Sequence, residues 1–175
     1  PYTEWLNKGK AGVPVELGVT VGIVEDQHQF ILHHRVMQQE VDVDIAVLII
    51  QETQKRFPQL SSCSFDQGFH SVPNQRQLAD VLETVILPKK GRLSKTDQVR
   101  QQQVVFIEGR CQHAAVESAI HALEVHGLDR CPDRGLPAFK RYIALAVVAR
   151  NLQILGRYIQ KMEQNIEQER CKKAA

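Results

Sequence analysis

The sequence predicts one domain of the mixed α/β class, with a mixed β-sheet flanked by helices and a long C-terminal helix. Three observations predict this class. Two runs rich in β-branched residues surround a polar turn, short apolar runs alternate with helical patterns in the middle, and helical periodicity dominates the last third. A chain of 175 residues with 43% hydrophobic residues is long enough to bury one core.

Composition narrows the class of protein. No apolar run approaches the roughly 18 residues of a membrane span, and no basic-then-apolar signal segment is visible. We therefore expect a soluble, intracellular protein with no membrane partner. The four cysteines are widely spaced without a C-x-x-C pair, which predicts free thiols over a zinc site. The net charge of +2 allows a nucleic-acid partner but does not predict one.

The N-terminal half predicts a hairpin, two helices and two short strands. The segment VPVELGVTVGIVEDQHQFILHHRVM forms two β-rich runs around a polar turn at 25–29, the pattern of an antiparallel hairpin. Residues 42–57 carry apolar side chains at helical spacing and precede Pro58. The elements that follow are a short strand, a helix and a buried strand, at residues 63–65, 74–83 and 85–87.

The C-terminal half predicts an exposed loop and two helices. The loop is expected over the basic residues 89–100, and a helix from Ile107 to His126, where Gly127 suits a C-terminal cap. The final helix is expected over 138–169. Its apolar repeat consists of Phe139, Ile143, Val147, Leu152, Leu155, Ile159, Met162 and Ile166. Residues 1–159 would form the body, and residues 160–175 a polar helix end that frays.

The order of these elements predicts the sheet topology. Two strands joined through a helix form a parallel crossover beside the antiparallel hairpin. This is the later part of an RNase H-like arrangement, in which an antiparallel three-stranded unit precedes two parallel strands. Only two of the first three strands are visible, so the opening strand is expected to be missing, before residue 1.

The helix at 107–126 carries a polar stripe centred on Glu117. At about 100° per residue its members fall on one face, and a mostly opposite apolar arc would face the core. The stripe consists of Arg110, His113, Glu117, His121 and Glu124, and the apolar arc of Val116, Ala119, Ile120 and Leu123. Many such stripes are only solvated faces, so a second feature is needed to indicate a site.

Asp66 is that second feature. It ends the strand expected at 63–65 and precedes Gly68, at the edge where open α/β sheets gather ligands, although a turn-forming aspartate is the alternative. If Asp66 and Glu117 meet, their hard oxygen atoms suit Mg²⁺ or Mn²⁺. Two carboxylates are too few for a two-metal site, and the third would belong to the missing opening strand.

Four stretches carry a resemblance to a known family: KGKAGVPVELGVTVGIVEDQHQFILHHRVM, SFDQGFHS, VILPKKGRLS and RCQHAAVESAIHALEVHGLDRCPDRGLPAFKRYIALAVVARNLQILG. Over about residues 5–158 the chain resembles the C-terminal part of DDE transposases from prokaryotic insertion sequences. The run R-x-x-H-x-x-V-E followed by H-G-L-D-R-C is the most specific motif, and F-D-Q-G is the weakest.

The resemblance implies a function and a site. Asp66 matches the second acid of the catalytic triad and Glu117 the third. Such enzymes cut DNA at element ends and join the ends to target DNA through two divalent metals. Arg110 and His113 match basic positions of the motif, which implies that they hold phosphate or orient the glutamate. The protein would then act in the prokaryotic cytoplasm, at the nucleoid.

The chain departs from the family pattern at its N-terminus. The first acid of the family belongs to a strand upstream of the KGKAG hairpin, where no strand is visible, and Glu4 lies too close to the hairpin to replace it. Asp42 and Asp44 begin a helix, and we expect them to favour its N-terminal dipole. The usual N-terminal DNA-binding segment is absent too. We expect a truncated transposase that is inactive in this form. The alternative is a non-catalytic DNA-binding or transposition-regulating remnant.

Two further surfaces are candidates for binding. The basic residues Lys89, Lys90, Arg92 and Lys95 are expected either to contact DNA phosphates, displacing condensed counterions, or to form a solubilising loop. The third class of function is a structural or interaction protein. It would use the final helix, with Leu152 and Leu155, as a homodimer face.

Overall fold

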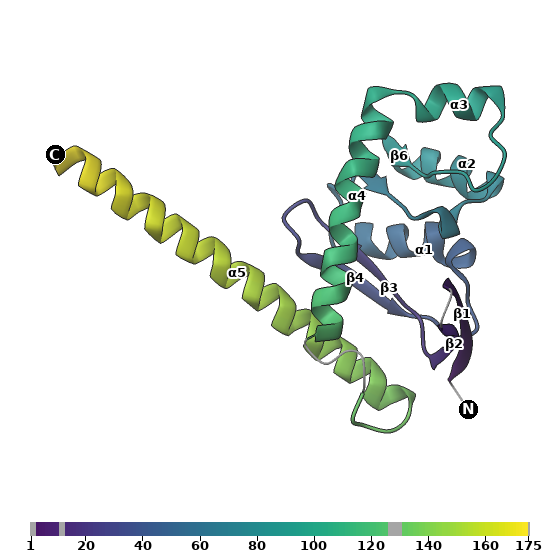
Figure 1. The fold of residues 1–175 in the computed structure, drawn as a ribbon, viewed down its shortest axis with the longest axis horizontal. Coiled ribbons are helices and arrows are strands. Elements are labelled where there is room, and N and C mark those ends of the chain that lie inside the picture. Colours follow the sequence, from purple (N-terminus) through teal and green to yellow (C-terminus); the bar gives the residue numbers. More distant parts are fainter. Residues whose placement is uncertain (1–2, 11–12, 126–130, 175) are drawn as a thin grey trace.

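The computed structural model describes residues 3–10, 13–125 and 131–174, with side chains described at 3–5, 18–113, 116, 120–125 and 131–172. The protein is a mixed α/β fold with small sheets and a long C-terminal helix, as the sequence predicts (Figure 1). In chain order the elements are β1 (Glu4–Lys10), β2 (Val13–Gly18), β3 (Val21–Glu25), β4 (Ile31–Val36), α1 (Asp42–Gln54), β5 (Ser62–Ser64), the short 3₁₀ helix η1 (Gln67–Phe69), α2 (Val72–Val81), β6 (Thr84–Ile86), α3 (Lys95–Gln101), α4 (Val104–Leu123) and α5 (Leu136–Ala174).

The strands form three two-stranded sheets. β1 pairs with β2 and β3 with β4, both antiparallel, whereas β5 and β6 are parallel. The predicted antiparallel hairpin and parallel pair are therefore confirmed. Within the described parts of the chain no backbone ladder links β3 to β5, so the hairpin and the parallel pair are not joined into the single mixed sheet that the sequence predicts.

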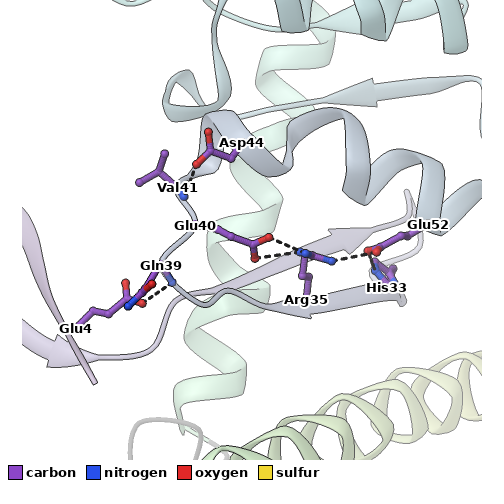
Figure 2. A network of polar contacts seen from close by, with 8 residues as sticks. All are labelled: Glu4, His33, Arg35, Gln39, Glu40, Val41, Asp44 and Glu52. Atoms are coloured by element: carbon purple, nitrogen blue, oxygen red, sulfur yellow. Dashed lines mark hydrogen bonds and ion pairs between the residues drawn. The ribbon is translucent and has the colours of Figure 1, made fainter. Parts of the chain in front are cut away.

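β1 corrects the expectation that no strand precedes the KGKAG turn. Its sequence EWLNKGK is rich in residues that disfavour strands, so propensity gives little sign of it. Pairing supplies what propensity lacks, because Trp5 lies opposite Leu17. In addition, the Gln39 backbone N–H donates to Oε1 of Glu4 at 2.7 Å (Figure 2). Among the described strands β1 pairs with β2 alone, so it does not occupy the place of the opening strand of an RNase H-like sheet.

Helix α1 packs closely on the β3–β4 hairpin. It begins at Asp42 as predicted and ends at Gln54, three residues earlier than expected. A Cβ atom at Gly22 of β3 would lie only 3.0 Å from Cδ1 of Ile45 and 3.1 Å from Cδ1 of Ile49, so the hairpin can approach the helix only where this glycine stands. The buried residues of the helix are Ile45, Ala46, Ile49, Ile50 and Thr53.

An ion-pair network fixes α1 along β4. Arg35 of β4 donates to Oε1 of Glu40 at 2.6 Å and to Oε1 of Glu52 at 3.0 Å (Figure 2). Glu52 also lies 3.1 Å from Nε2 of His33. Glu40 precedes α1, and Glu52 belongs to its last turns. The guanidinium therefore links both ends of α1 to one strand and sets the position of the N-terminus of the helix.

Two apolar clusters lie on opposite faces of the β3–β4 hairpin. Alternation along β3 sends Val24 to the α1 side and Ile23 to the other side. The second cluster joins the hairpin to the end of α4 and the first part of α5, through Leu123 and Ile143. The side-chain amide of Asn151 also bonds both backbone groups of Ile31, at 2.9 and 3.0 Å. The first half of α5 is thus attached to the body.

Helix α3 replaces part of the loop predicted over residues 89–100. Ser94 caps it: Oγ of Ser94 accepts from the Asp97 backbone N–H at 3.1 Å, and Asp97 accepts from the Ser94 N–H at 3.2 Å. This reciprocal pair is a capping box with aspartate in place of the usual glutamate. The loop prediction was wrong from Lys95 onward because the basic residues hid this local signal.

The exposure and the extent of helices α4 and α5 differ in part from the sequence predictions. Ile120 was expected to face the core, but its side chain is 45% exposed, whereas Leu123 is buried as expected. The predicted cap at Gly127 lies outside the described residues. α5 continues to Ala174 and projects away from the body, so the segment expected to fray is helical (Figure 1). Five residues of the predicted apolar repeat of this helix are exposed: Leu152, Leu155, Ile159, Met162 and Ile166.

Candidate functional site

Asp66 stands at the C-terminal end of β5, as the sequence predicts. The Phe65 backbone N–H donates to the Ile86 carbonyl at 2.9 Å and extends the parallel pair by one residue. Asp66 follows, exposed, and its Oδ1 accepts from the Gln67 N–H at 2.6 Å at the start of η1. The aspartate therefore both ends a strand and forms a turn. One carboxylate oxygen is engaged by the backbone, and the carboxylate remains open to solvent.

Helix α4 crosses the C-terminal ends of β6 and β5. A Cβ atom at Gly109 would lie 2.6 Å from Cγ1 of Ile86, so the helix backbone rests directly on the last residue of β6. One turn later, Nδ1 of His113 lies 3.0 Å from Oγ of Ser64, the last residue of β5. His113 is half-buried between helix and strand. The sequence alone did not predict this contact.

Glu117 lies on α4 one turn after His113, but its side chain lies outside the described residues. Its predicted meeting with Asp66 therefore remains a prediction. Only a short stretch of backbone separates each acid from the contact between Ser64 and His113. Asp66 is two residues past Ser64, about 7 Å of extended chain, and Glu117 is four residues past His113, about 6 Å of helix. The contact between Ser64 and His113 joins the two elements that carry these positions.

Asp42 is a carboxylate near Asp66 that the sequence analysis assigned to a helix dipole. Its Oδ2 lies 2.5 Å from where a Cβ atom of Gly68 would stand, so this carboxylate rests against η1. Burial raises the pKa of Asp42, and the negative charge of Asp66 raises it further. The N-terminus of α1 thus places a second acid beside Asp66. The topology could have predicted this proximity, because the N-terminus of a helix that follows β4 lies at the same edge of the fold as the end of β5.

Asp44, in contrast, has the local role that the sequence predicts. Its Oδ2 accepts from the Val41 backbone N–H at 3.2 Å, in the first turn of α1 (Figure 2). It therefore satisfies one of the free donors at the helix start.

A cavity of about 840 Å³ lies between β3 and β5. Ile23 and Glu25 line it from β3, Ser62 and Ser64 from β5, and residues of α1 and α4 cover its two sides. The hairpin turn at 26–29 and the segment 57–61 meet at one end of the cavity. The end of β3 therefore lies beside the start of β5, and the two strands are antiparallel.

Both strand edges that face this cavity have free backbone groups. The Met37 N–H donates to the Thr20 carbonyl at 2.9 Å, which fixes the alternation of the hairpin so that Val21 and Ile23 turn their backbone groups away from β4. In the parallel pair, the carbonyl of Ser61 and the N–H of Phe65 bond toward β6, so Ser62 and Ser64 turn theirs away. The cavity therefore lies between two strand edges that pair with no other described strand.

Glu25 is a half-buried carboxylate that lines this cavity. Its Oε2 is buried without a partner, as is Nε of Arg150. Burial raises the pKa of Glu25, although the positive charge of Arg150 acts in the opposite direction. The carboxylate is thus held near a cation without a hydrogen bond between the two groups being formed.

The predicted DNA-contacting cations are not equivalent. Nζ of Lys89 lies 2.8 Å from Oδ2 of Asp97, and hydrogen bonds from Lys89 and Ser94 hold the pKa of Asp97 far below its usual range. The charge of Lys89 is therefore offset inside the fold. The other cations predicted to contact DNA phosphates are exposed: Lys90, Arg92, Lys95 and Arg110.

The described residues contain no group of three or more histidine, cysteine or acidic side chains placed to hold a metal. None of the four cysteines forms a disulfide, and burial raises the pKa of the Cys63 thiol to about 12. Within the described segments no helix is long and apolar enough to cross a membrane.

Comparisons with protein-family models, curated proteins and solved structures found no match to this chain.

Proposed function

We propose that the chain belongs to a metal-dependent enzyme that cuts DNA and joins DNA ends, with Asp66 and Glu117 as two of its acidic metal ligands. The observation that carries the proposal is the contact of His113 with Ser64, which holds α4 across the end of β5. The proposal also rests on the resemblance of the surrounding motifs to DDE transposases. An RNase H-like arrangement and action on insertion-sequence ends are parts of the same proposal.

The acidic residues at this edge suit a hard divalent cation. Asp42 and Asp66 lie close enough for the charge of one to raise the pKa of the other, and a cation between them would relieve this repulsion. Carboxylate oxygens are the ligands that Mg²⁺ and Mn²⁺ prefer. When bound, two such ions activate water or a 3′-hydroxyl for attack on a phosphodiester and stabilise the departing oxygen.

The chain's own residues supply position and charge. His113, fixed by Ser64, sets the rotation of α4 and hence the direction in which position 117 points. Arg110, one turn earlier and exposed, is placed to hold a DNA phosphate. Lys90, Arg92 and Lys95 extend this positive surface, whereas Lys89 is engaged with Asp97.

The cavity between β3 and β5 supports the RNase H-like part of the proposal. A strand in that place would run antiparallel to β3 and parallel to β5, and both free edges would then be paired. Its C-terminal end would lie beside Ser64, next to Asp66. An acid at that end would be the third ligand that a two-metal site needs.

Metal binding tests the site. Manganese added to the protein should broaden the backbone NMR signals of residues 64–68 and of α4 around position 117, because Mn²⁺ relaxes nearby nuclei. Asp66→Asn and Glu117→Gln should each weaken this binding by at least about tenfold, since ligand loss costs more than loss of a supporting hydrogen bond. Glu108→Gln, on the opposite side of α4, is the matched control. Broadening that survives Asp66→Asn unchanged would disprove the site.

A non-catalytic DNA-binding protein is the second candidate function. The exposed cations Lys90, Arg92, Lys95 and Arg110 favour it. In that case Asp66→Asn and Glu117→Gln would leave DNA affinity unchanged or improved, with or without Mg²⁺. A metal-dependent enzyme would instead lose the part of its DNA affinity that depends on the divalent ion.

A further inference from the structure

Helix α5 has an exposed apolar seam with a regular spacing. Seven residues, spaced alternately three and four positions apart, run along three heptad repeats. They are Leu145, Val148, Leu152, Leu155, Ile159, Met162 and Ile166, and every one is exposed. We call this set the α5 seam.

The α5 seam is not the face by which α5 packs on its own chain. That face consists of Ile143, Val147, Arg150 and Ile154, all buried. At about 100° per residue the two faces point in nearly opposite directions. Tyr158 still contacts the hairpin turn: its ring stacks on that of Phe30 with the centroids 5.9 Å apart, and its hydroxyl lies 3.3 Å from Nδ1 of His28. Beyond Tyr158 the helix projects away from the body (Figure 1). The seam therefore has no partner among the described residues.

The spacing indicates what covers the seam. Apolar residues at alternating intervals of three and four are the a and d positions of a coiled coil, in which each side chain enters a hole on the facing helix. A helix that packs on a sheet or a bundle core has a wider and less regular stripe. The seam spans 22 residues, so it offers about 33 Å of contact along the helix.

The residues beside the seam favour an identical partner helix. In a homodimer each flanking residue meets its own copy or a close neighbour, so charged flanks of one sign would repel. Between Leu145 and Met162 the flanking positions are uncharged. On one flank, Asn151 and Tyr158 contact the hairpin of the same chain; the other flank consists of Ala149 and Gly156. A Cβ atom at Gly156 would meet nothing within 4 Å, so this flank is open to a second helix. Three charged residues of this stretch stand away from the seam: Arg150, which is buried, Arg157 and Lys161.

We propose that the α5 seam of one copy pairs with that of a second copy in a two-stranded coiled coil, so that the protein is a dimer joined through α5. The contact is isologous, with the same surface used by both copies. This proposal does not depend on the proposed DNA chemistry. Failure of the dimer would leave the metal site untouched, and failure of the metal site would leave the dimer.

Sedimentation equilibrium with one seam variant and one matched control tests the proposal. Leu152→Glu places a carboxylate at the centre of the seam in both copies and should weaken the dimer at least about hundredfold, because buried unpaired charges at an interface are strongly unfavourable. The control is Val105→Glu on α4, because Val105 is 59% exposed, close to the 62% of Leu152, and lies outside the seam. It should leave the dimer unchanged.

A second variant acts in the opposite direction, so that misfolding cannot imitate its effect. Val148 occupies a d position, where leucine favours two-stranded coils. Val148→Leu adds one methylene group per helix and should tighten the dimer by about tenfold. A wild-type chain that stays monomeric at its highest soluble concentration would overturn the proposal. So would equal weakening by Leu152→Glu and Val105→Glu, or a Val148→Leu dimer no tighter than wild type.

Discussion

The close contact between α4 and β6 gives the sharpest test of how the site is assembled. Gly109 is the helix residue at this contact, and an added Cβ atom would lie 2.6 Å from Cγ1, 3.2 Å from Cδ1 and 3.4 Å from Cγ2 of Ile86. Ile86 is 4% exposed and has little room to move. Gly109→Ala should therefore push α4 away from the sheet.

The magnitude follows from two opposing effects. Replacing glycine by alanine inside a helix gains about 1 kcal/mol of helix propensity. Overpacking a tight core contact costs about 1–3 kcal/mol, and a 2.6 Å approach to a buried branched side chain belongs at the upper end. The net change in the free energy of unfolding should be a loss of about 1–2 kcal/mol.

Gly156→Ala is the matched control for this substitution. It lies in the interior of α5, where an added Cβ atom meets nothing within 4 Å, so only the propensity gain of about 0.5–1 kcal/mol should remain. Urea unfolding of the three proteins measures both changes. In the double variant Gly109→Ala, Ile86→Ala, the cost should be smaller than the sum of the two single costs, because the small side chain makes room. A Gly109→Ala protein at least as stable as wild type would refute the packing of α4 on β6.

Three further predictions follow from the charges and thiols. Asp42→Asn should raise stability at neutral pH. Because the pKa of Asp42 is raised in the folded state, the stability of the wild-type protein should fall as pH rises above the usual carboxyl range. Urea unfolding between about pH 4 and 8 should therefore show a flatter dependence of stability on pH for the variant. Lys90→Ala combined with Arg92→Ala should lower the salt slope of DNA binding by up to about two, if both contact phosphates, whereas Lys89→Ala should change it less because Asp97 already holds that lysine. At mildly alkaline pH, iodoacetamide should label the exposed Cys111 faster than Cys63, whose thiol pKa is about 12; equal rates in the folded protein would contradict the burial of Cys63.

Local patterns predicted most of the elements. The β3–β4 hairpin, α1, α2 and the two short parallel strands follow from alternation, helical spacing and turn residues within a few positions of one another. α3 was missed although its capping residues are local, because a run of basic residues suggested a loop. β1 was missed because its stability comes from pairing with β2 and from the contact of Glu4 with Gln39, which no local pattern contains.

The neighbours of Asp66 could not be predicted from local sequence patterns, because they depend on how distant elements pack together. Asp66 was correctly placed at the end of a strand, yet its neighbour Asp42 is 24 positions away and was assigned to a helix dipole. The two residues meet because α1 returns along the hairpin and begins at the edge where β5 ends. Periodicity likewise found the apolar residues of α5 but not which face is covered. Its second face has the spacing of a coiled coil rather than of a core.

The cavity between β3 and β5 bears on both the fold and the proposed chemistry. The backbone groups on both of its edges need hydrogen-bond partners, which either water or an added strand could supply. A strand in that place would approach α4 at its own C-terminal end, because it would run parallel to β5. In the proposed enzyme, the segment that completes the sheet would therefore also deliver the acid that Asp66 and Glu117 need. Asp42 already stands at that edge. If a divalent cation binds there, as proposed, it would offset the repulsion between Asp42 and Asp66.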